Sequence, residues 1–398
     1  MRLRLIVVTI LCMSFTLMLN VSSTTTTTAS AASNSCSTSR PLNVLGMWPI
    51  QGEEPDASNN FQDGALLAIK ALNKAGGVCG HPVHYQHVFM SAFDAPQAVG
   101  AYKQVQGINP DVILGLGGET EALGKLVGEG GVPVISSDLN EDAEFGGPVG
   151  SKWLWFISSD EQQEWINSTK YLVKQLGLKK VGIMGYTIPF GSVAAAASTK
   201  ELQQLGLKPC ANQTISAPGA TDLTLQVLAM KPCDAIVNAS YPDDIALELR
   251  QALQNGITVP TILQGGITVA ETSKLVTGAA ISNSYANADC NTLSGTPAMK
   301  AYVKAFKKAY GSQPDYLSAV TYDAVMLAGA AAEKAGKFTH AAINKAIGTV
   351  NYSGICQSYH ADARQTLAHT NFILKFNSNG TWRQVASETI PSLAKLGS

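Results

Sequence analysis

Residues 180–184 read Lys-Val-Gly-Ile-Met, and residues 234–238 read Asp-Ala-Ile-Val-Asn. Both are short, mostly apolar runs with the length of a buried strand, and residues 192–205 between them are predicted to form a helix. After the second run, residues 243–253 place apolar side chains on one helical face, and Gly256 ends that helix. This alternation of strand and helix predicts parallel strands in a sheet that helices cover on both faces.

The N-terminal half contains an earlier series of the same kind. Apolar runs at 43–47, 111–114 and 132–135 predict strands, and residues 60–75 and 122–128 predict helices. Two successive series, in a chain longer than one hydrophobic core usually supports, predict two domains. The expected fold class is therefore α/β with two doubly wound parallel sheets. In such sheets ligands bind at the loops that follow the carboxyl ends of the strands.

The first 32 residues have the pattern of a secretory signal peptide. Arg2 and Arg4 precede an apolar run at 5–21, and residues 29–32 offer small side chains for cleavage. We therefore expect segment 1–32 to be removed and the protein to be exported, to the periplasm or the cell envelope.

The charge balance argues against a polyanionic partner. Charged residues make up 14% of the chain, and removal of Arg2 and Arg4 leaves 26 basic against 29 acidic residues. Since no basic block is present, we expect no nucleic-acid partner. The apolar run at 324–332 is too short to span a bilayer and predicts a buried helix. A lipid anchor is not expected either, because Ser33 stands where a lipoprotein has an aliphatic residue before Cys36.

No motif of catalysis or nucleotide binding meets its requirements. Residues 115–120 read Gly-Leu-Gly-Gly-Glu-Thr after a predicted strand, but the dinucleotide fingerprint needs glycine where Thr120 stands. Glu119 would also repel a pyrophosphate. The sequence contains neither Gly-x-Ser-x-Gly nor His-Glu-x-x-His. We expect no enzyme activity and no cofactor.

His81, His84 and His87 are close enough in sequence to suggest a metal site. Residues 83–89, however, predict a strand, in which successive side chains point to opposite faces. His84 would then point away from the other two, so a solvated strand explains the cluster and no metal is expected.

Six cysteines remain after signal removal, and their even number in an exported protein favours disulfides over metal ligands or reactive thiols. Six cysteines allow 15 pairings, and their spacing alone does not choose among them. They are Cys36, Cys79, Cys210, Cys233, Cys290 and Cys356.

Several segments, in their order and spacing, resemble the branched-chain amino-acid-binding (Leu/Ile/Val-binding) type of periplasmic solute receptor. The similarity extends from about residue 41 to 390. The segments are Gly46–Gly52, Gly64–Val78, Gly131–Ser136, Ser159–Gln163, Phe190-Gly191, Tyr241–Asp243 and Thr321–Ala324.

This resemblance implies a type I periplasmic-binding-protein fold, in which a hinge of three crossing strands joins two lobes. Lobe 1 would comprise residues 41–156 plus 282–370, and lobe 2 residues 157–281 plus 371–398. Such a protein binds a small-molecule ligand between its lobes, as a monomer, and delivers it to the membrane permease of an ABC transporter. Two alternatives remain open: a ligand-sensing receptor that feeds a signalling partner, and a hydrolase on the same fold.

The resemblance also identifies ligand-binding positions in lobe 1. The first cleft loop of the family offers serine and small residues, whereas this sequence has Glu119 and Thr120 in a loop about two residues shorter. The next loop matches well, and Ser136 and Ser137 would supply hydroxyl and backbone donors.

In lobe 2, Phe190 replaces a cleft tyrosine of the family, and Tyr241 retains the second one. The acidic residue that neutralises an amino acid's ammonium should fall within residues 264–266, which read Gln-Gly-Gly here. Gln264 therefore cannot supply the charge, and a buried ammonium without a carboxylate would cost several kcal/mol. Either Glu119 supplies it, or the ligand carries no ammonium. Trp48, Phe190 and Tyr241 favour an apolar or aromatic ligand body with one polar end.

The two-lobe arrangement implied by the resemblance restricts the disulfides, because a bridge between lobes would obstruct closure. We expect pairing within lobes, as Cys36–Cys79, Cys210–Cys233 and Cys290–Cys356.

Overall fold

The computed structural model describes residues 36–51, 53, 57–92, 94–116, 120–137, 151–265 and 275–392. Residues 34–398 form one compact unit. The predicted signal peptide, residues 1–32, lies outside the described residues, as does Glu119.

The first sheet has five parallel strands in the order β2-β1-β3-β4-β5. Its strands are β1 (Leu42–Pro49), β2 (Val83–Met90), β3 (Val112–Gly115), β4 (Val134–Ser136) and β5 (Leu154–Phe156). The helices between them are α1 (Ala57–Lys74), α2 (Ala95–Ile108) and α3 (Thr120–Gly130).

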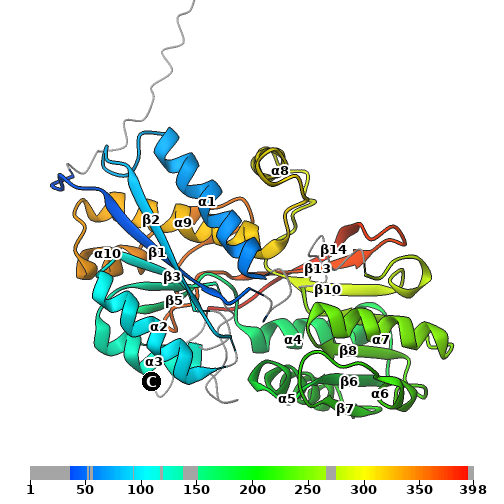
Figure 1. Cartoon of the computed structure of the whole chain (residues 1–398). Helices are drawn as coiled ribbons and strands as arrows, with labels where there is room; N and C mark the ends of the chain where they lie inside the picture. The colour runs from blue at the N-terminus through cyan, green and yellow to red at the C-terminus, as the bar shows by residue number, and fades with distance from the viewer. Residues whose placement is uncertain are drawn as a thin grey trace, which may run out of the picture. The chain divides into compact units, whose positions relative to one another are not determined.

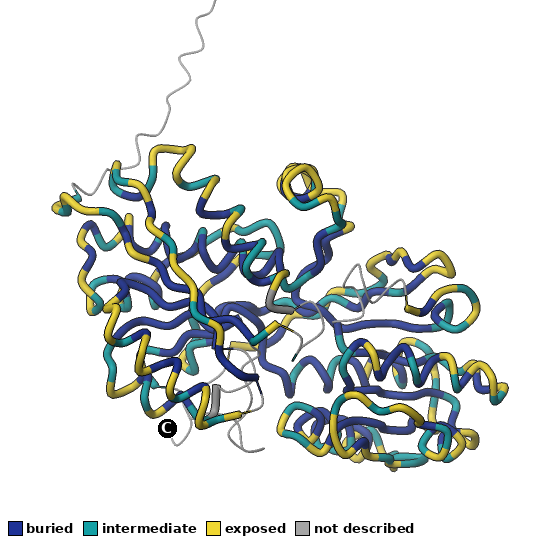
Figure 2. Tube along the Cα trace, viewed as in Figure 1, coloured by how far each residue is buried: buried dark blue, intermediate teal, exposed yellow. Residues whose placement is uncertain are grey.

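Alternation along each strand gives this sheet two apolar faces. On β3, Val112 and Leu114 join the core beneath α1 and its neighbours, while Ile113 packs on the other side with α2 and α3. Figure 2 shows β1, β3, β4 and β5 buried along most of their length, as expected for strands covered on both faces, whereas the edge strand β2 is buried only at its two ends.

The second sheet has seven strands in the order β14-β13-β10-β9-β8-β6-β7. They are β6 (Val181–Tyr186), β7 (Asn212–Ile215), β8 (Ala235–Ala239), β9 (Thr261–Leu263), β10 (Ser284–Ala288), β13 (Thr370–Phe376) and β14 (Trp382–Thr389). One face is covered by α4 (Glu161–Lys170), its π-helical continuation (Tyr171–Gln175) and α5 (Pro189–Gln204). The other is covered by α6 (Thr224–Ala229) and α7 (Pro242–Gln254), with a 3-10 turn at Gly278–Ala280 (Figure 1).

The structure confirms the predicted fold class and adds one feature. Strands β6 to β10 are parallel, but β13 and β14 pair antiparallel and complete the sheet on the β10 side. A strictly alternating strand and helix pattern did not predict this antiparallel edge.

The remaining elements, between β10 and β13, pack with the first sheet. They are α8 (Pro297–Tyr310), α9 (Tyr316–Ala335), α10 (His340–Ile347) and the short strands β11 (Tyr352–Ser353) and β12 (Ser358–Tyr359). Helix α9 lies against α1 and contains the apolar run that predicted a buried helix. Its first turn is capped by Asp315, which accepts from the Ser318 N–H at 2.8 Å, and it ends at Gly336 in the left-handed region.

The chain passes between the two sheets three times. Residues 157–160 connect β5 to α4, residues 289–296 connect β10 to α8, and residues 360–369 connect β12 to β13. Strand β10 belongs to the second sheet, although residues from 282 onward were assigned to lobe 1. The lobe boundaries as a whole stay a prediction.

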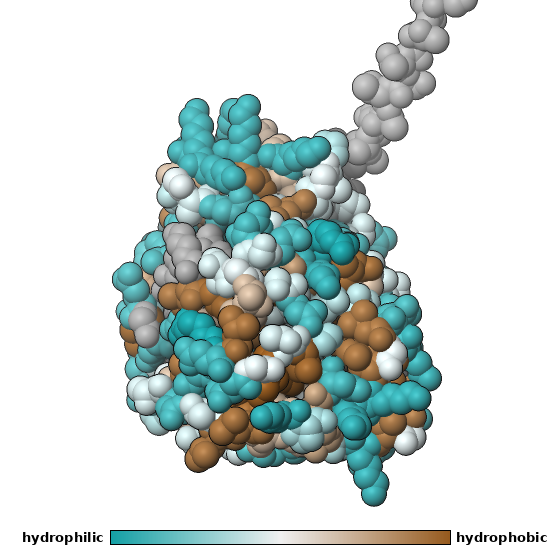
Figure 3. Space-filling view, turned by 90° about the vertical axis from the view of Figure 1, so that its right-hand side faces the viewer, coloured by the Kyte–Doolittle hydropathy of each residue, from teal (hydrophilic) through white to brown (hydrophobic). Residues whose placement is uncertain are grey.

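The structure contains the three expected disulfides. The Cα atoms are 5.6 Å apart in Cys36–Cys79, 5.7 Å in Cys210–Cys233 and 4.8 Å in Cys290–Cys356. Among the described helices, none is both long and apolar enough to cross a membrane. Figure 3 shows one face of the molecule, on which hydrophilic side chains separate the apolar patches.

Arg40 ties the start of the described chain to the first sheet. Its two terminal nitrogens donate to the two oxygens of Asp111, both at 2.6 Å, and one also donates to the Phe338 carbonyl at 2.7 Å. The Asp111 side chain is 4% exposed, and it also accepts from the Asn43 N–H at 2.8 Å.

Replacing Arg40 should therefore destabilise the fold. Arg40→Gln leaves the buried carboxylate of Asp111 without its cation and should lower the free energy of unfolding by about 1.5–3 kcal/mol. The exposed pair Lys125–Glu129 gives the control, because Lys125→Gln should change stability by less than about 0.5 kcal/mol. Urea unfolding measures both, and equal effects would show that Arg40 is only a surface charge.

Glu248 on α7 is a fully buried acidic residue beside Asn238 of β8. Burial raises the pKa of Glu248 from 4.5 to about 7, and the Asn238 amide opposes this in part. Because the folded-state pKa is raised, the folded protein holds a proton that the unfolded chain releases. The contribution of Glu248 to the free energy of unfolding is therefore greatest below about pH 4.5, and it is lost as the pH rises through about 7.

Glu248→Gln should then stabilise the protein at pH 8, by up to about 3 kcal/mol, and leave it unchanged at pH 4.5. Unfolding curves at both pH values measure the difference from the parent. The exposed Glu129→Gln variant serves as the control and should show no such pH-dependent gain. A Glu248→Gln variant that is less stable than the parent at pH 8 would contradict a raised pKa.

Candidate functional site

The described ligand-binding candidates lie near the carboxyl ends of strands, where this architecture places its sites. Ser136 ends β4 and Ser137 follows it. Phe190 and Tyr241 stand at the starts of α5 and α7, after β6 and β8, and Gln264 follows β9. The structure thus divides these candidates between the two sheets.

In the first sheet, the backbone of the serine pair is held by the first crossing. The Ser136 carbonyl accepts from the Ile157 N–H at 2.9 Å, and the Ser137 carbonyl accepts from the Ser158 hydroxyl at 3.1 Å. Ser137 is 5% exposed, and its own hydroxyl has no hydrogen-bond partner among the described residues. A hydroxyl that is already buried and has no partner among these residues can donate to a ligand oxygen with little further desolvation cost. Thr120 is the first residue of α3.

Trp48 is a core residue in this structure. Its side chain is fully buried, its indole N–H donates to the Tyr85 hydroxyl at 2.7 Å, and its ring stacks on Phe61 at 5.6 Å. The neighbouring strand approaches so closely that a side chain at Gly115 would meet the Met47 carbonyl. Packing therefore accounts for Gly115 and for Trp48, and a ligand contact by Trp48 stays a prediction.

In the second sheet, two aromatic rings form a parallel stack. The Phe190 and Tyr241 rings are 5.8 Å apart between centroids, with 3° between their planes. Both are half-buried. Phe190 also lies against Trp165 at 6.4 Å, and Tyr241 against Tyr186 at 5.2 Å.

A buried hydrogen-bond network fixes Tyr241. The Tyr186 hydroxyl donates to the Asp244 carboxylate and accepts from the Tyr241 N–H at 3.0 Å. Asp244 also accepts from the N–H groups of Gly219 and Ala220, at 3.0 and 2.9 Å. Burial and the adjacent Asp244 raise the pKa of the Tyr186 hydroxyl, which therefore stays protonated as a donor.

Gln264 joins the second sheet to α9. Its amide nitrogen donates to the Tyr316 hydroxyl at 2.9 Å, and Tyr316 is the first residue of α9. Burial raises the pKa of Tyr316, so its hydroxyl is neutral. An amide and a neutral phenol thus meet at Gln264, and neither group carries a negative charge.

Sequence reasoning missed a buried acidic group at the crossings. Asp289 accepts from the Ser159 N–H at 3.1 Å, and Glu164 accepts from the Ser159 hydroxyl at 2.7 Å. Burial raises the pKa of both carboxyls, and the nearby Asp289 raises that of Glu164 further. Residues 159–163 belong to the segments that carry the resemblance, but nothing in the sequence links Ser159 to Asp289, 130 residues away.

The histidine cluster behaves as predicted from strand alternation. His87 contacts Tyr85 and Phe89, which share its face of β2, and His84 is exposed on that strand. Within the described parts of the chain, the only group with metal-like spacing is Cys36, Cys79 and Glu333. Its two sulfurs form a disulfide and offer no thiolate.

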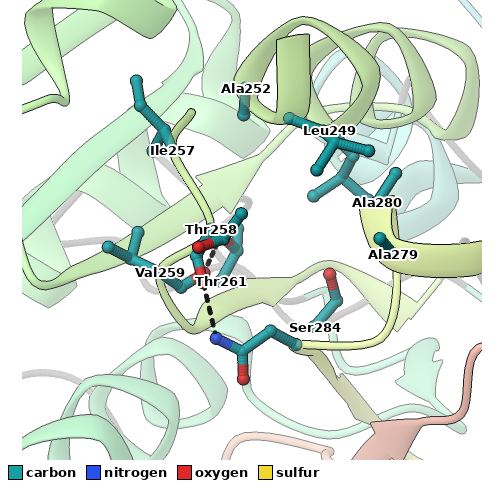
Figure 4. Close-up of a pocket in the computed structure, with 11 residues that line it drawn as sticks. Leu249, Ala252, Ile257, Thr258, Val259, Thr261, Ala279, Ala280 and Ser284 are labelled. Atoms are coloured by element: carbon teal, nitrogen blue, oxygen red, sulfur yellow. Dashed lines mark hydrogen bonds between the residues drawn. The ribbon is translucent and has the colours of Figure 1, made fainter. Parts of the chain in front are cut away.

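A small cavity beside α7 lies apart from the candidate residues. Its volume is about 20 Å³, which is room for about one water. Mostly apolar side chains of the second-sheet half line it (Figure 4), among them Leu249, Ala252, Ile257, Val259 and Ala280. It is too small to hold an organic solute.

Comparison with known proteins identifies the family. The sequence pattern of the family described as periplasmic binding protein matches residues 41–381. The Leu/Ile/Val-binding protein homolog 7 of Brucella abortus (strain 2308) is 24% identical over 337 residues, covering 79% of this chain and 82% of the relative.

Solved structures agree on the fold. A branched-chain amino acid transporter substrate binding protein from Streptococcus pneumoniae, in complex with isoleucine, is 22% identical with a TM-score of 0.76, and the match covers 88% of this chain and 99% of that one. A solute binding protein from R. palustris in complex with benzoate is 17% identical with a TM-score of 0.77, covering 89% and 98%. The chain therefore belongs to the periplasmic binding protein family, as a Leu/Ile/Val-binding-protein-like member with the type I fold.

Proposed function

We propose that this protein captures a small organic solute between its two lobes, outside the cytoplasm, and delivers it to the membrane permease of an ABC transporter. It would act as a monomer and without catalysis. The observation that carries the proposal is the placement of Ser136 and Ser137 on one sheet and of the Phe190–Tyr241 stack on the other, both at the carboxyl ends of strands. Family membership supports the same role.

The ligand class follows from the polarity of the candidate residues. The parallel rings of Phe190 and Tyr241 favour an apolar or aromatic ligand body. The serine pair favours one polar end, such as a carboxylate, because hydroxyl and backbone N–H groups bond well to it. With Gln264 in place of an acidic residue, a buried ammonium would lack a partner on the second sheet. We therefore propose a carboxylated or neutral compound without an ammonium group.

Both ligand chemistries occur among proteins of similar fold. The structure from R. palustris holds benzoate, an aromatic carboxylate, and the one from Streptococcus pneumoniae holds isoleucine. The benzoate chemistry fits the proposal better, because it needs no carboxylate at the position of Gln264. An amino-acid ligand would require Glu119 to supply the charge.

Mass spectrometry of small molecules released by denaturing the freshly purified protein tests the proposal directly. We expect a stoichiometric aromatic or branched carboxylic compound, or an amide. A thermal-shift screen over such acids, amides and amino acids should identify the same class, since a ligand at 100 times its dissociation constant stabilises by about 2.7 kcal/mol. Turnover of a bound ester or amide during incubation would instead support a hydrolase.

Loss of the aromatic stack should weaken binding. Tyr241→Ala removes the ring that Phe190 stacks on and should lower affinity about 10- to 100-fold. Tyr241→Phe retains the ring and should keep most of the affinity, which separates stacking from loss of fold. Calorimetry with the ligand identified above measures both. Equal, small effects of the two variants would place the ligand away from this stack.

Glu119→Gln distinguishes the two ligand classes. For a ligand without an ammonium, we expect a loss of about 1 kcal/mol or less. For an amino acid, the substitution leaves a buried ammonium unpaired and should cost about 3–5 kcal/mol. If Glu119→Gln still bound leucine or valine tightly, both alternatives would be wrong: that Glu119 neutralises the ligand's ammonium, and that the ligand carries no ammonium.

A further inference from the structure

A chain of hydrogen bonds links the three crossings side by side. The Asp289 carboxylate, in the second crossing, accepts from the backbone of Ser159 in the first. The Asp289 carbonyl accepts from the side-chain amide of Gln357 at 3.0 Å. The same amide reaches the third crossing, where its oxygen accepts from the N–H groups of His369 and Thr370 at 3.1 and 2.9 Å.

A covalent bond reinforces this linkage at its centre. Cys290 follows Asp289 directly, Cys356 precedes Gln357 directly, and the two cysteines form a disulfide. The bridge thus fixes the second crossing to the β11–β12 hairpin at the point where the Gln357 amide bonds. Neither of the other two disulfides lies at a crossing.

The hairpin itself is anchored to α9. The buried Asp323 accepts from the N–H groups of Ile355 and Cys356, at 2.8 and 3.0 Å, and from the Tyr359 hydroxyl at 2.9 Å. A side chain at Gly354 would collide with the Asp323 carboxylate, so only glycine permits this close approach. The contacts therefore run without a break from α9, through the hairpin, to all three crossings.

We propose that the Cys290–Cys356 disulfide and Gln357 form a hinge clamp, whose residues position the crossings rather than touch the ligand. The inference rests on the proposed function, since it concerns how the lobes open and close. Three unlinked segments can twist independently, whereas clamped segments bend together and restrict the lobes to one opening motion. The clamp raises affinity by reducing the number of open arrangements from which the lobes must close.

The test compares two variants that each lack one disulfide and carry spin labels on the two halves. Labels on Lys125→Cys of α3 and Lys208→Cys, which follows α5, report the distance distribution between the lobes by electron double resonance, without any ligand. We expect Cys290→Ala with Cys356→Ala to widen the distribution about twofold relative to the parent. Cys210→Ala with Cys233→Ala removes a disulfide away from the crossings and should leave the width unchanged.

Gln357→Met keeps the disulfide and removes only the amide bonds, so it tests the clamp even if the cysteine variant fails to fold. It should also widen the distribution. An unchanged width in Gln357→Met, or in a folded Cys290/Cys356 variant, would overturn the proposal. Equal widening in the Cys210/Cys233 variant would overturn it too, because the effect would then reflect general loss of stability.

Binding provides a second readout. If only about a tenth of the unclamped molecules can close around a ligand, the apparent affinity falls about tenfold. We expect this loss for both clamp variants. Thermal-shift titrations with benzoate measure it, or titrations with isoleucine should benzoate not bind. A protein that binds neither probe would call the proposed function into question, while the distance distributions would still test the clamp.

Discussion

Strands β6 to β10 run parallel, as do β1 to β5, so within each sheet the carboxyl ends of these strands lie along one edge. The parallel direction of the strands places the loops after β4, β6, β8 and β9 at the carboxyl ends of the sheets, where ligands bind in this architecture. Their placement does not depend on the side chains that the loops carry. In the proposed site, these loops supply hydroxyls at Ser136 and Ser137 and aromatic rings at Phe190 and Tyr241. Strands β4, β6, β8 and β9 are buried along their whole length and hold these loops on rigid supports.

Buried polar and acidic side chains gather at the three crossings. Glu164 and Asp289 are buried carboxyls, and desolvation raises the pKa of each. Ser159 donates one hydrogen bond to each of them, and Gln357 connects Asp289 to the third crossing. A buried polar network costs free energy when some of its groups lose their hydrogen bonds. The network therefore favours the one arrangement of the three crossings in which these bonds form. We regard this specificity as the reason for polar groups in a region that apolar residues could also have filled.

The sequence was sufficient to predict strands that are buried on both faces. Ile113 and Leu114 of β3 face opposite cores. Because both faces of the strand are buried, successive residues are apolar, and the sequence shows a continuous apolar run at 112–114. Antiparallel β13 and β14 were not predicted, because the fold was inferred from strands that alternate with helices, and no helix separates these two strands. The disulfide pairing could be predicted because the two-lobe arrangement left few compatible choices. Trp48 and Asp289 could not be placed, since their partners Phe61 and Ser159 become neighbours only through tertiary packing.

In the proposed function, a bound solute closes two lobes that the crossings allow to move. Small-angle scattering on the purified protein, before and after addition of the solute identified by mass spectrometry, tests it most directly. We expect a smaller radius of gyration in the loaded protein, together with a higher thermal midpoint. A solute that binds and raises the midpoint but leaves the radius of gyration unchanged would contradict closure around the ligand.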